Sequence, residues 1–421
     1  MNAFALSDLQ DQPRVYPGKG RKARVAYFIT HPIQYQAPLL RRIAKEPDID
    51  MTTFFGTGLS ADKYIDPGFG IPIEWDVPLL EGYQYEFLPE LMRTKTITRF
   101  AWPLNYGILS RLRRGRFDVA WIFGYNRVLC IHAILACRLL GLPVILRAEP
   151  NLFSRPRSRF KLFVKSALAS VLKAAVDCVV PIGEANEAYW KHYFGGDFPM
   201  YRMPYTVDND FFQKRAQEAA PHRENLRARL GLRPDLPVVL YASKLTTRKR
   251  CGDLVEAFIR LAPAPGVDPA ACLLIIGDGE ERAHLEERVR QSGLSNIRFL
   301  GFRNQTELPA YYDLSDVFVL PSCSETWGLV VNEVMNAGRP VIVTSQIGCQ
   351  PDLVHDGANG FVVPVSDVPA LSAALRRLIE DPRLRASMGE NSLRIIQNYS
   401  FEEDVAGFRQ AIAHAVPGFV A

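Results

Sequence analysis

Two glutamates in the second half of the chain have the spacing and surroundings of a ligand-binding turn. Glu325 lies in a polar turn after an apolar run that ends at Pro321, and Glu333 lies in a helical stretch that begins at Gly328 and ends at Gly338. A carboxylate at a strand end can accept hydrogen bonds from sugar hydroxyls, and the free N–H groups at a helix start favour phosphate oxygens. The segment therefore combines a hydroxyl binder with an anion binder. Spacing alone also allows a buried helix with one solvated and one capping glutamate.

Two lysines follow an earlier strand candidate of the same half. Lys244 and Lys249 lie in a loop between the apolar run that begins at Pro237 and a helical stretch. Two ammonium groups can neutralise a diphosphate, both while it is bound and as it leaves. A basic loop is usually a solvated surface, but its place before the two glutamates favours the phosphate role. Nearby, Gly277 lets a ligand approach the backbone, although its surroundings match neither the GxGxxG nor the GxxxxGK pattern.

Polar residues also follow strand candidates in the first half. Three loops carry them: His31, Gln34 and Tyr35 in the first, Asn126 and Arg127 in the second, and Arg147 and Glu149 in the third. The carboxyl ends of parallel strands meet at one edge of a sheet, where such groups reach a ligand crevice. Glu149 could take the proton of a hydroxyl nucleophile or bind sugar hydroxyls, with Arg147 orienting it. The alternatives are a locally satisfied loop histidine and an ordinary Arg–Glu pair.

These loops need a regular scaffold, and the sequence indicates one. Apolar runs rich in β-branched and aromatic residues alternate with amphipathic helix-length stretches, which is typical of parallel sheets covered by helices. The alternation is irregular only between about residues 56 and 100. We predict a flexible leader (1–23), two doubly wound domains (24–205 and 206–398) that face each other across a cleft, and a terminal helix (399–421) that packs back on the first domain.

The composition limits the class of protein. The 421 residues are 48% apolar, which supports a buried core in each domain and excludes a disordered or fibrous chain. The net charge is only +5, and the seven scattered cysteines show neither a CxxC pair nor zinc-like spacing. We therefore expect a reduced, cytoplasmic protein. The triplet Asp208, Asn209 and Asp210 offers two carboxylates, too few for a good metal site, so we interpret it as a linker turn and predict no metal.

Two stretches of the first half are basic and lack acidic residues. Residues 91–117 contain seven Lys or Arg side chains, and residues 150–176 contain six. Apolar residues in the second stretch recur at helical spacing, so it can lie on an anionic bilayer as an amphipathic helix. Peripheral contact with the inner face of a membrane is one interpretation, and a core-facing helix with a solvated basic face is the other. No nucleic-acid partner is expected, because neither stretch belongs to a recognised binding module.

The second half resembles the retaining glycosyltransferases of family four, the group 1 glycosyltransferases, which have the GT-B fold. The resemblance extends from about Pro237 to Pro364 and is carried by the two glutamates and their neighbours: Pro321, Ser322, Glu325, Gly328, Glu333, Gly338, Pro340 and Val341. It departs from the family at Ser243, Lys244 and Arg250, where Gly, Arg and Gly are usual. It fades in the first half, where a Gly-rich turn is missing and Ala148 stands at a usual His position.

The resemblance implies roles for these residues. The first glutamate, Glu325, would touch the donor sugar, Glu333 would hold the nucleotide ribose, and Lys244 and Lys249 would stabilise the diphosphate. The further donor-binding residues would be Gly277, Arg303, Trp327, Gly328, Leu329 and Val330. We place Glu149 and His31 with Glu325 in the catalytic group, and we expect the acceptor to contact Gln34, Tyr35, Asn126 and Arg147.

The implied activity is the transfer of a sugar from a nucleotide sugar to a hydroxyl of a saccharide or lipid-linked acceptor. The resemblance further implies retention of configuration, a place in polysaccharide or glycolipid biosynthesis, and no cofactor. Two alternatives stay open. A GT-B nucleotide-sugar epimerase would need no acceptor, and a non-catalytic module would bind a nucleotide sugar or a membrane without turnover.

Overall fold

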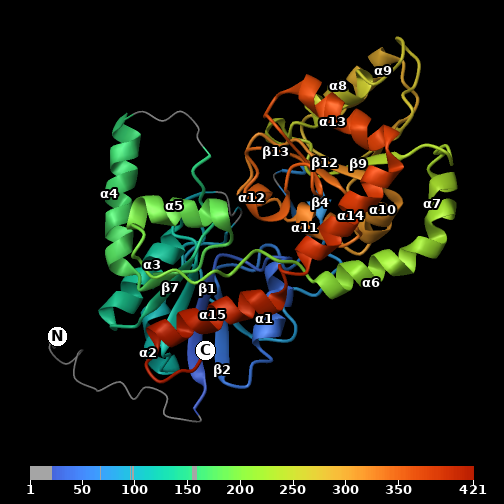
Figure 1. The fold of residues 1–421 in the computed structure, drawn as a ribbon. Coiled ribbons are helices and arrows are strands. Elements are labelled where there is room, and N and C mark those ends of the chain that lie inside the picture. The colour runs from blue at the N-terminus through green and yellow to red at the C-terminus, as the bar shows by residue number, and fades with distance from the viewer. Residues whose placement is uncertain (1–20, 67, 95, 97–98, 154–158) are drawn as a thin grey trace, which may run out of the picture.

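The first half of the chain forms a parallel sheet. The computed structural model describes residues 21–421 except 67, 95, 97–98 and 154–158, and within them the strand order of this sheet is β5-β2-β1-β6-β7-β8 (Figure 1). The strands are β1 (Ala23–Ile29), β2 (Ile49–Phe55), β5 (Gln84–Phe87), β6 (Val119–Phe123), β7 (Val144–Arg147) and β8 (Cys178–Val179). The helices are α1 (Gln36–Ile43), α2 (Ile108–Gly115), α3 (Val128–Leu139), α4 (Arg159–Ala175) and α5 (Glu184–Phe194).

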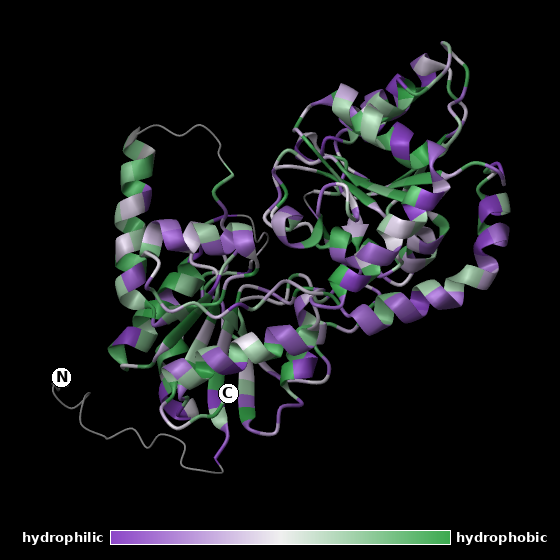
Figure 2. Ribbon diagram, viewed as in Figure 1, coloured by the Kyte–Doolittle hydropathy of each residue, from purple (hydrophilic) through white to green (hydrophobic). Residues whose placement is uncertain are grey.

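Strand β1 shows how this sheet is buried on both faces. Its alternate side chains Val25 and Tyr27 pack with α1 and the C-terminal helix, whereas Ala26 and Phe28 pack with α2, α3 and α5. All four are fully buried. Because both faces are covered, the strand has a continuous apolar sequence, as parallel strands commonly do. Figure 2 shows the same pattern as hydrophobic strands inside mixed helices.

The second half forms another parallel sheet with the order β11-β10-β9-β12-β13-β14. Its strands are β9 (Val238–Ala242), β10 (Cys272–Ile276), β11 (Ile297–Gly301), β12 (Val317–Leu320), β13 (Val341–Thr344) and β14 (Gly360–Val363). Its helices are α6 (Asn209–Ala219), α7 (Arg223–Arg229), α8 (Cys251–Ile259), α9 (Arg282–Ser292), α10 (Leu308–Leu314), α11 (Val330–Met335), α12 (Gln350–Leu353), α13 (Val368–Glu380) and α14 (Pro382–Ile396). Both sheets reverse their strand order beside the first strand, which is the doubly wound arrangement that we predicted.

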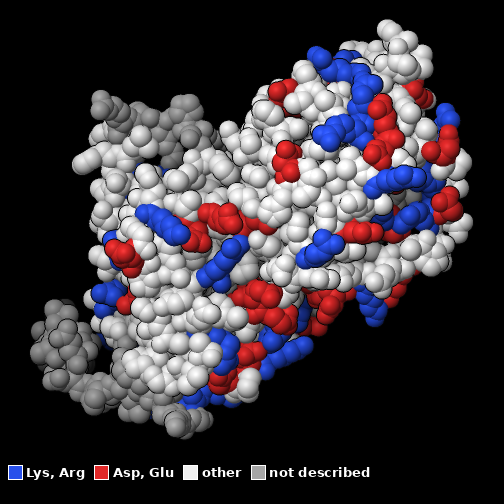
Figure 3. Space-filling model, viewed as in Figure 1, with Lys and Arg blue, Asp and Glu red and all other residues white. Residues whose placement is uncertain are grey.

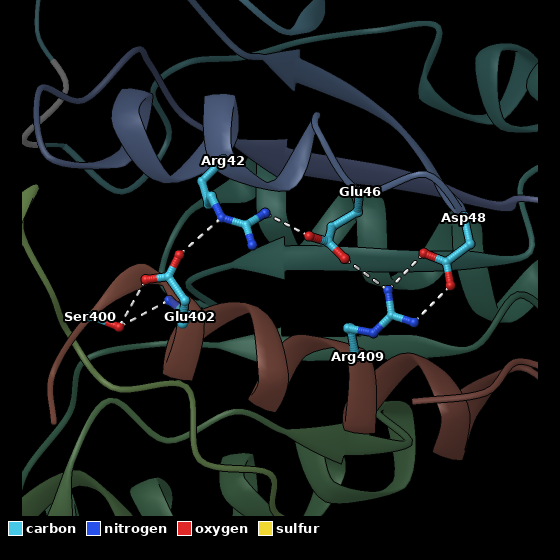
Figure 4. A network of polar contacts seen from close by, with 6 residues as sticks. All are labelled: Arg42, Glu46, Asp48, Ser400, Glu402 and Arg409. Atoms are coloured by element: carbon cyan, nitrogen blue, oxygen red, sulfur yellow. Dashed lines mark hydrogen bonds and ion pairs between the residues drawn. The ribbon is translucent and has the colours of Figure 1, made fainter.

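The C-terminal helix α15 (Phe401–Ala415) returns to the first half and packs against its sheet and α1 (Figure 1). Ser400 caps it with a capping box. Arg409 binds Asp48 with two hydrogen bonds of 2.7 Å and Glu46 at 2.9 Å, and Arg42 binds Glu46 at 2.6 Å (Figure 4). The predicted return of the last helix is therefore confirmed.

The connection between the halves is held by a capped helix. The Asp208 carboxylate accepts a hydrogen bond of 3.0 Å from the backbone N–H of Phe211 at the start of α6. Asn209 donates to the backbone oxygens of Ile396 and Tyr399. The acidic triplet thus caps a helix and ties the linker to α14, as its interpretation as a turn predicted.

The stretch for which the sequence predicted no structure contains three short strands of the described chain. Strand β5 extends the first sheet by pairing in parallel with β2. A short antiparallel hairpin is formed by β3 (Tyr64–Ile65) and β4 (Pro72–Ile73). None of the described helices combines the length and the hydrophobicity that a membrane-spanning helix needs. On the face shown in Figure 3, basic and acidic side chains are interspersed.

Candidate active site

The predicted functional residues gather where the two sheets face each other. In each sheet the strand order reverses between its first and fourth strands, β1 and β6 in the first and β9 and β12 in the second. Ligands of open α/β sheets bind outside the carboxyl ends of such strands. The loops at these four strand ends carry Tyr35, Asn126, Lys249 and Glu325.

Three adjoining cavities occupy this region. We name them after one lining residue each: the Glu333 cavity of ≈ 170 Å³, the Glu325 cavity of ≈ 200 Å³ and the His31 cavity of ≈ 560 Å³. Ser243 and Val330 line both of the first two cavities. Tyr35, Glu149 and Thr326 line both of the last two. The cavities therefore follow one another in a row across the two halves.

The Glu333 cavity contains a buried carboxyl group in aromatic surroundings. Tyr312 donates a hydrogen bond of 2.5 Å to Glu333, and burial raises the pKa of Glu333 to about 7. Gly277 also lines the cavity, with φ of +132°, and a Cβ there would lie 1.9 Å from the backbone oxygen of Ser243. Only glycine fits that position. Arg303 lines the same cavity and donates to the Tyr311 hydroxyl at 3.1 Å.

The Glu325 cavity contains a buried ion pair. Lys249 lies in the 3-10 turn Thr247–Lys249, and its Nζ is 2.6 Å from Oε1 of Glu325. The two side chains are only 12% and 8% exposed. Burial lowers the pKa of Lys249, and the Glu325 carboxylate opposes that shift. Asn151 of the first half donates to the backbone oxygen of Glu325 at 2.9 Å, which ties this turn to the facing sheet.

Glu149 stands at the junction of the Glu325 and His31 cavities. It accepts hydrogen bonds from the hydroxyls of Tyr35 at 3.2 Å, Thr326 at 3.2 Å and Tyr205. Thr326 belongs to the second half and Tyr35 to the first. The carboxylate therefore links the two facing loops.

The His31 cavity is lined by the predicted residues His31, Asn126 and Arg127. Nδ1 of His31 lies 2.8 Å from the Thr30 hydroxyl. Burial, with a smaller effect from Arg127, lowers the pKa of His31 to about 4. His31 is therefore neutral at neutral pH and leaves one ring nitrogen as an acceptor.

Several predicted contacts differ in the structure. Arg147 is completely buried and pairs with Asp404 of α15 at 3.2 Å, so its guanidinium does not reach an acceptor. Gln34 lines the Glu333 cavity instead of the predicted acceptor region and donates to Gln305 at 2.6 Å. Lys244 is bound to Asp66 at 2.6 Å, so its ammonium is already neutralised.

The turn after β12 also differs in detail from the prediction. The Trp327 side chain is 2% exposed and donates from its indole to Asn332 at 2.8 Å, so its indole belongs to the core. The helix that was expected to begin at Gly328 begins at Val330 and is six residues long. Trp327 nevertheless lines the Glu325 cavity, together with Gly328, Leu329 and Val330.

The site includes residues that sequence reasoning missed. Phe69 and Trp75 line the Glu333 cavity, and Thr326 lines the other two. Phe69 and Trp75 lie in the stretch without periodicity, and their aromatic character was the only signal. In the described part of the chain, no group of three or more His, Cys, Asp or Glu side chains is placed to hold a metal ion.

Comparison with known proteins defines the class. The family model "Glycosyl transferases group 1" matches residues 222–394. Alpha-D-kanosaminyltransferase of Streptomyces kanamyceticus is 30% identical over 271 residues, which are 62% of this chain and 67% of the relative. Lipopolysaccharide core biosynthesis glycosyltransferase LpsE of Rhizobium meliloti is 31% identical over 189 residues, which are 44% of this chain and 53% of that relative.

Solved structures agree on the architecture. Sucrose-phosphate synthase from Thermosynechococcus elongatus superposes with a TM-score of 0.67 at 20% identity, over 93% of this chain and 98% of that chain. WaaG, a glycosyltransferase involved in lipopolysaccharide biosynthesis, superposes with a TM-score of 0.64 at 17% identity, over 91% and 99% of the two chains. The architecture is thus the two-domain GT-B fold of glycosyltransferases. The chain belongs to the group 1 glycosyltransferases.

Proposed function

We propose that this glycosyltransferase moves a sugar from a nucleotide sugar to a hydroxyl of a saccharide or lipid-linked acceptor along the three linked cavities. The observation that supports this most is the order of their linings. An aromatic cavity with a buried carboxyl group comes first, a cavity with a Lys–Glu pair comes second, and a larger polar cavity comes third. A nucleoside, a sugar diphosphate and an acceptor follow one another in the same order.

The residues divide the reaction between them. Glu333 accepts hydrogen bonds from the ribose hydroxyls, and the Lys249 ammonium stabilises the charge that develops on the departing diphosphate. When the diphosphate takes Lys249, Glu325 is free to accept hydrogen bonds from the transferred sugar. The His31 cavity takes the acceptor, whose hydroxyl oxygen bonds to the anomeric carbon as the bond to the phosphate oxygen breaks.

We further propose that configuration is retained, by attack on the face that the diphosphate leaves. The acceptor proton then passes to the departing phosphate oxygen, which lies nearest on that face. Three hydroxyl groups already donate to Glu149. We therefore propose that Glu149 positions the loops that carry Tyr35 and Thr326 and does not take part in proton transfer. No metal ion or cofactor takes part in this proposal.

A transfer assay tests the activity. Purified protein is incubated with UDP-, GDP- and ADP-sugars and with saccharide acceptors, and NMR of the product shows the anomeric configuration. Lys249→Met should lower kcat by about ten- to 150-fold, because one charge-assisted hydrogen bond contributes about 1.5–3 kcal/mol. Lys214→Met, an exposed lysine on α6, is the matched control. Unchanged kcat in folded Lys249→Met would contradict the phosphate role, and donor conversion without acceptor would favour the epimerase.

We also propose that α4 contacts an anionic membrane surface. Its side chains Phe160, Phe163, Leu168 and Val171 are 65–73% exposed, and Leu139 of the neighbouring α3 is 70% exposed. The opposite side of α4 packs inward through Ala169. The helix is therefore apolar toward solvent as well as toward the core, within a segment, residues 150–176, that has six basic and no acidic residues.

Vesicle flotation tests this surface. Phosphatidylglycerol vesicles should carry the protein to the top of the gradient at low salt, and phosphatidylcholine vesicles should carry less of it. Phe163→Ser with Leu168→Ser should reduce flotation several-fold without changing the melting temperature. Equal flotation of the variant and the wild type, or no flotation on either lipid, would contradict the proposal.

A further inference from the structure

A segment of the first half reaches across to the second half beside the Glu333 cavity. We call the described residues 64–66 and 68–76, which contain the β3–β4 hairpin, the bridging hairpin. Asn304 donates a hydrogen bond of 2.6 Å to the backbone oxygen of Glu74, and Thr306 donates from its backbone N–H to Asp76 at 3.0 Å. These contacts hold the segment against the loop that follows β11.

The bridging hairpin supplies an aromatic wall to the Glu333 cavity. Phe69 and Trp75 line it together with Phe302 of the second half. The ring centroid of Phe302 lies 5.0 Å from that of Phe69 and 6.4 Å from that of Trp75. Both pairs meet edge to face, with interplanar angles of 77° and 62°. Aromatic rings that line a cavity are surfaces on which nucleotide bases can stack, whatever the base.

The same segment neutralises a lysine of the site. Asp66 Oδ1 lies 2.6 Å from Nζ of Lys244 and accepts hydrogen bonds from the backbone N–H groups of Gly68 at 2.7 Å and Phe69 at 3.0 Å. The Lys244 ammonium also lies 4.8 Å from the centre of the Phe69 ring. Its neighbour Ser243 lines both the Glu333 and the Glu325 cavities. The ammonium is therefore tied to an anion of the other half, and the preceding residue of the chain lines both cavities.

We propose that the bridging hairpin forms one wall of the donor site, where Phe69 and Trp75 stack on the nucleotide base. Asp66 pairs with Lys244 until the donor diphosphate takes the place of Asp66. This inference rests on the proposed function of the three cavities. Asp66 and a phosphate oxygen are both anionic, so they compete for one ammonium group. Donor binding is thereby coupled to release of the Asp66 contact between the halves.

The coupling makes two opposite predictions for one segment. Trp75→Ala removes a stacking surface and should weaken nucleoside diphosphate binding about tenfold. Asp66→Asn removes the competing charge and should tighten nucleoside diphosphate binding. The expected gain is only about threefold, because the Asp66–Lys244 pair is partly exposed and solvent weakens its attraction. In a Lys244→Met background, Asp66→Asn should have no further effect.

Calorimetric titration with UDP, GDP and ADP tests these outcomes. Asp62→Asn, an exposed carboxylate in the same loop, is the matched control and should bind as the wild type does. Melting temperatures confirm that each variant is folded. Binding that Asp66→Asn leaves unchanged or weakens, or that Trp75→Ala leaves unchanged, overturns the hairpin proposal. If Glu333→Ala loses nucleotide binding while the hairpin variants bind as the wild type does, the hairpin proposal fails but the proposed donor site is supported. If the wild type binds none of the three nucleotides, the proposed function fails as well.

Discussion

At the scale of single residues, the proposed contact between Glu333 and the ribose makes donor binding depend on the protonation of Glu333. Its pKa of about 7 in the folded protein lies above the unperturbed value of 4.5 because the carboxyl group is buried. As pH falls, the folded protein therefore binds this proton before the unfolded chain does. Protonation of Glu333 thus raises the free energy of unfolding as pH falls from 7 toward 4.5. A ribose that needs the carboxylate must displace the proton.

Nucleoside diphosphate binding should accordingly weaken as pH falls below 7. We expect the Kd to rise by up to about tenfold per pH unit, which corresponds to the loss of one linked proton. Calorimetry at pH 6, 7 and 8 measures it, and Glu333→Gln provides the control for titration of the phosphate itself. The same pH dependence in wild type and variant would show that Glu333 does not hold the ligand.

His31 shows the opposite pH effect on stability. Its pKa of about 4 in the folded protein lies below the unfolded value of 6.5, mainly because the ring is buried. The unfolded chain binds the proton first, so stability is lost as pH falls from 6.5 toward 4. Between pH 7 and pH 5 the wild type should lose on the order of 2 kcal/mol more than His31→Gln. Urea unfolding at both values measures this, and parallel losses would mean that His31 is solvated.

At the scale of elements, α15 is fastened to the first sheet by a buried ion pair. Arg147 at the end of β7 and Asp404 of α15 are 0% and 1% exposed. Arg147 also donates to the backbone oxygen of Met203 at 3.1 Å, and Thr206 donates to Asp404 at 3.2 Å. The pair therefore joins the last helix, the linker and the strand that precedes Glu149.

Breaking one side of this pair should destabilise the protein strongly. Asp404→Asn leaves the Arg147 charge buried without a partner, which should cost about 3–5 kcal/mol of unfolding free energy. The double variant Arg147→Met with Asp404→Leu should recover most of that loss, because both charges are gone. Denaturant unfolding monitored by circular dichroism measures it. A loss below about 1 kcal/mol in the single variant would show that water reaches the pair.

At the scale of the whole molecule, the sequence predicted which strand ends carry the candidate site better than it predicted the side-chain pairs within that site. Strands that are buried on both faces leave a strong apolar pattern in the sequence. From that pattern, His31 and Glu149 were placed at the carboxyl ends of strands in the first sheet, and Lys249 and Glu325 at those in the second. Partners far apart in the chain leave no such pattern. Nothing near Lys244 indicated Asp66, 178 positions earlier, and nothing near Arg147 indicated Asp404.

The bridging hairpin was missed for a related reason. Its strands β3 and β4 have two residues each, too few for the alternation that marks a strand. Its position depends on contacts with the other half, such as that between Phe69 and Phe302. Only the folded molecule brings these segments together, and they complete one side of the Glu333 cavity.

The central claim, that the three linked cavities form a nucleotide-sugar site, is tested most directly by a thermal-shift screen. Wild type and Glu333→Ala are compared against UDP, GDP and ADP and their sugar conjugates. A ligand at 100 times its Kd should stabilise the wild type by about 2.7 kcal/mol. We predict that one nucleotide raises the melting temperature of the wild type and much less that of Glu333→Ala. Equal shifts in both proteins, or no shift with any nucleotide, would contradict the account.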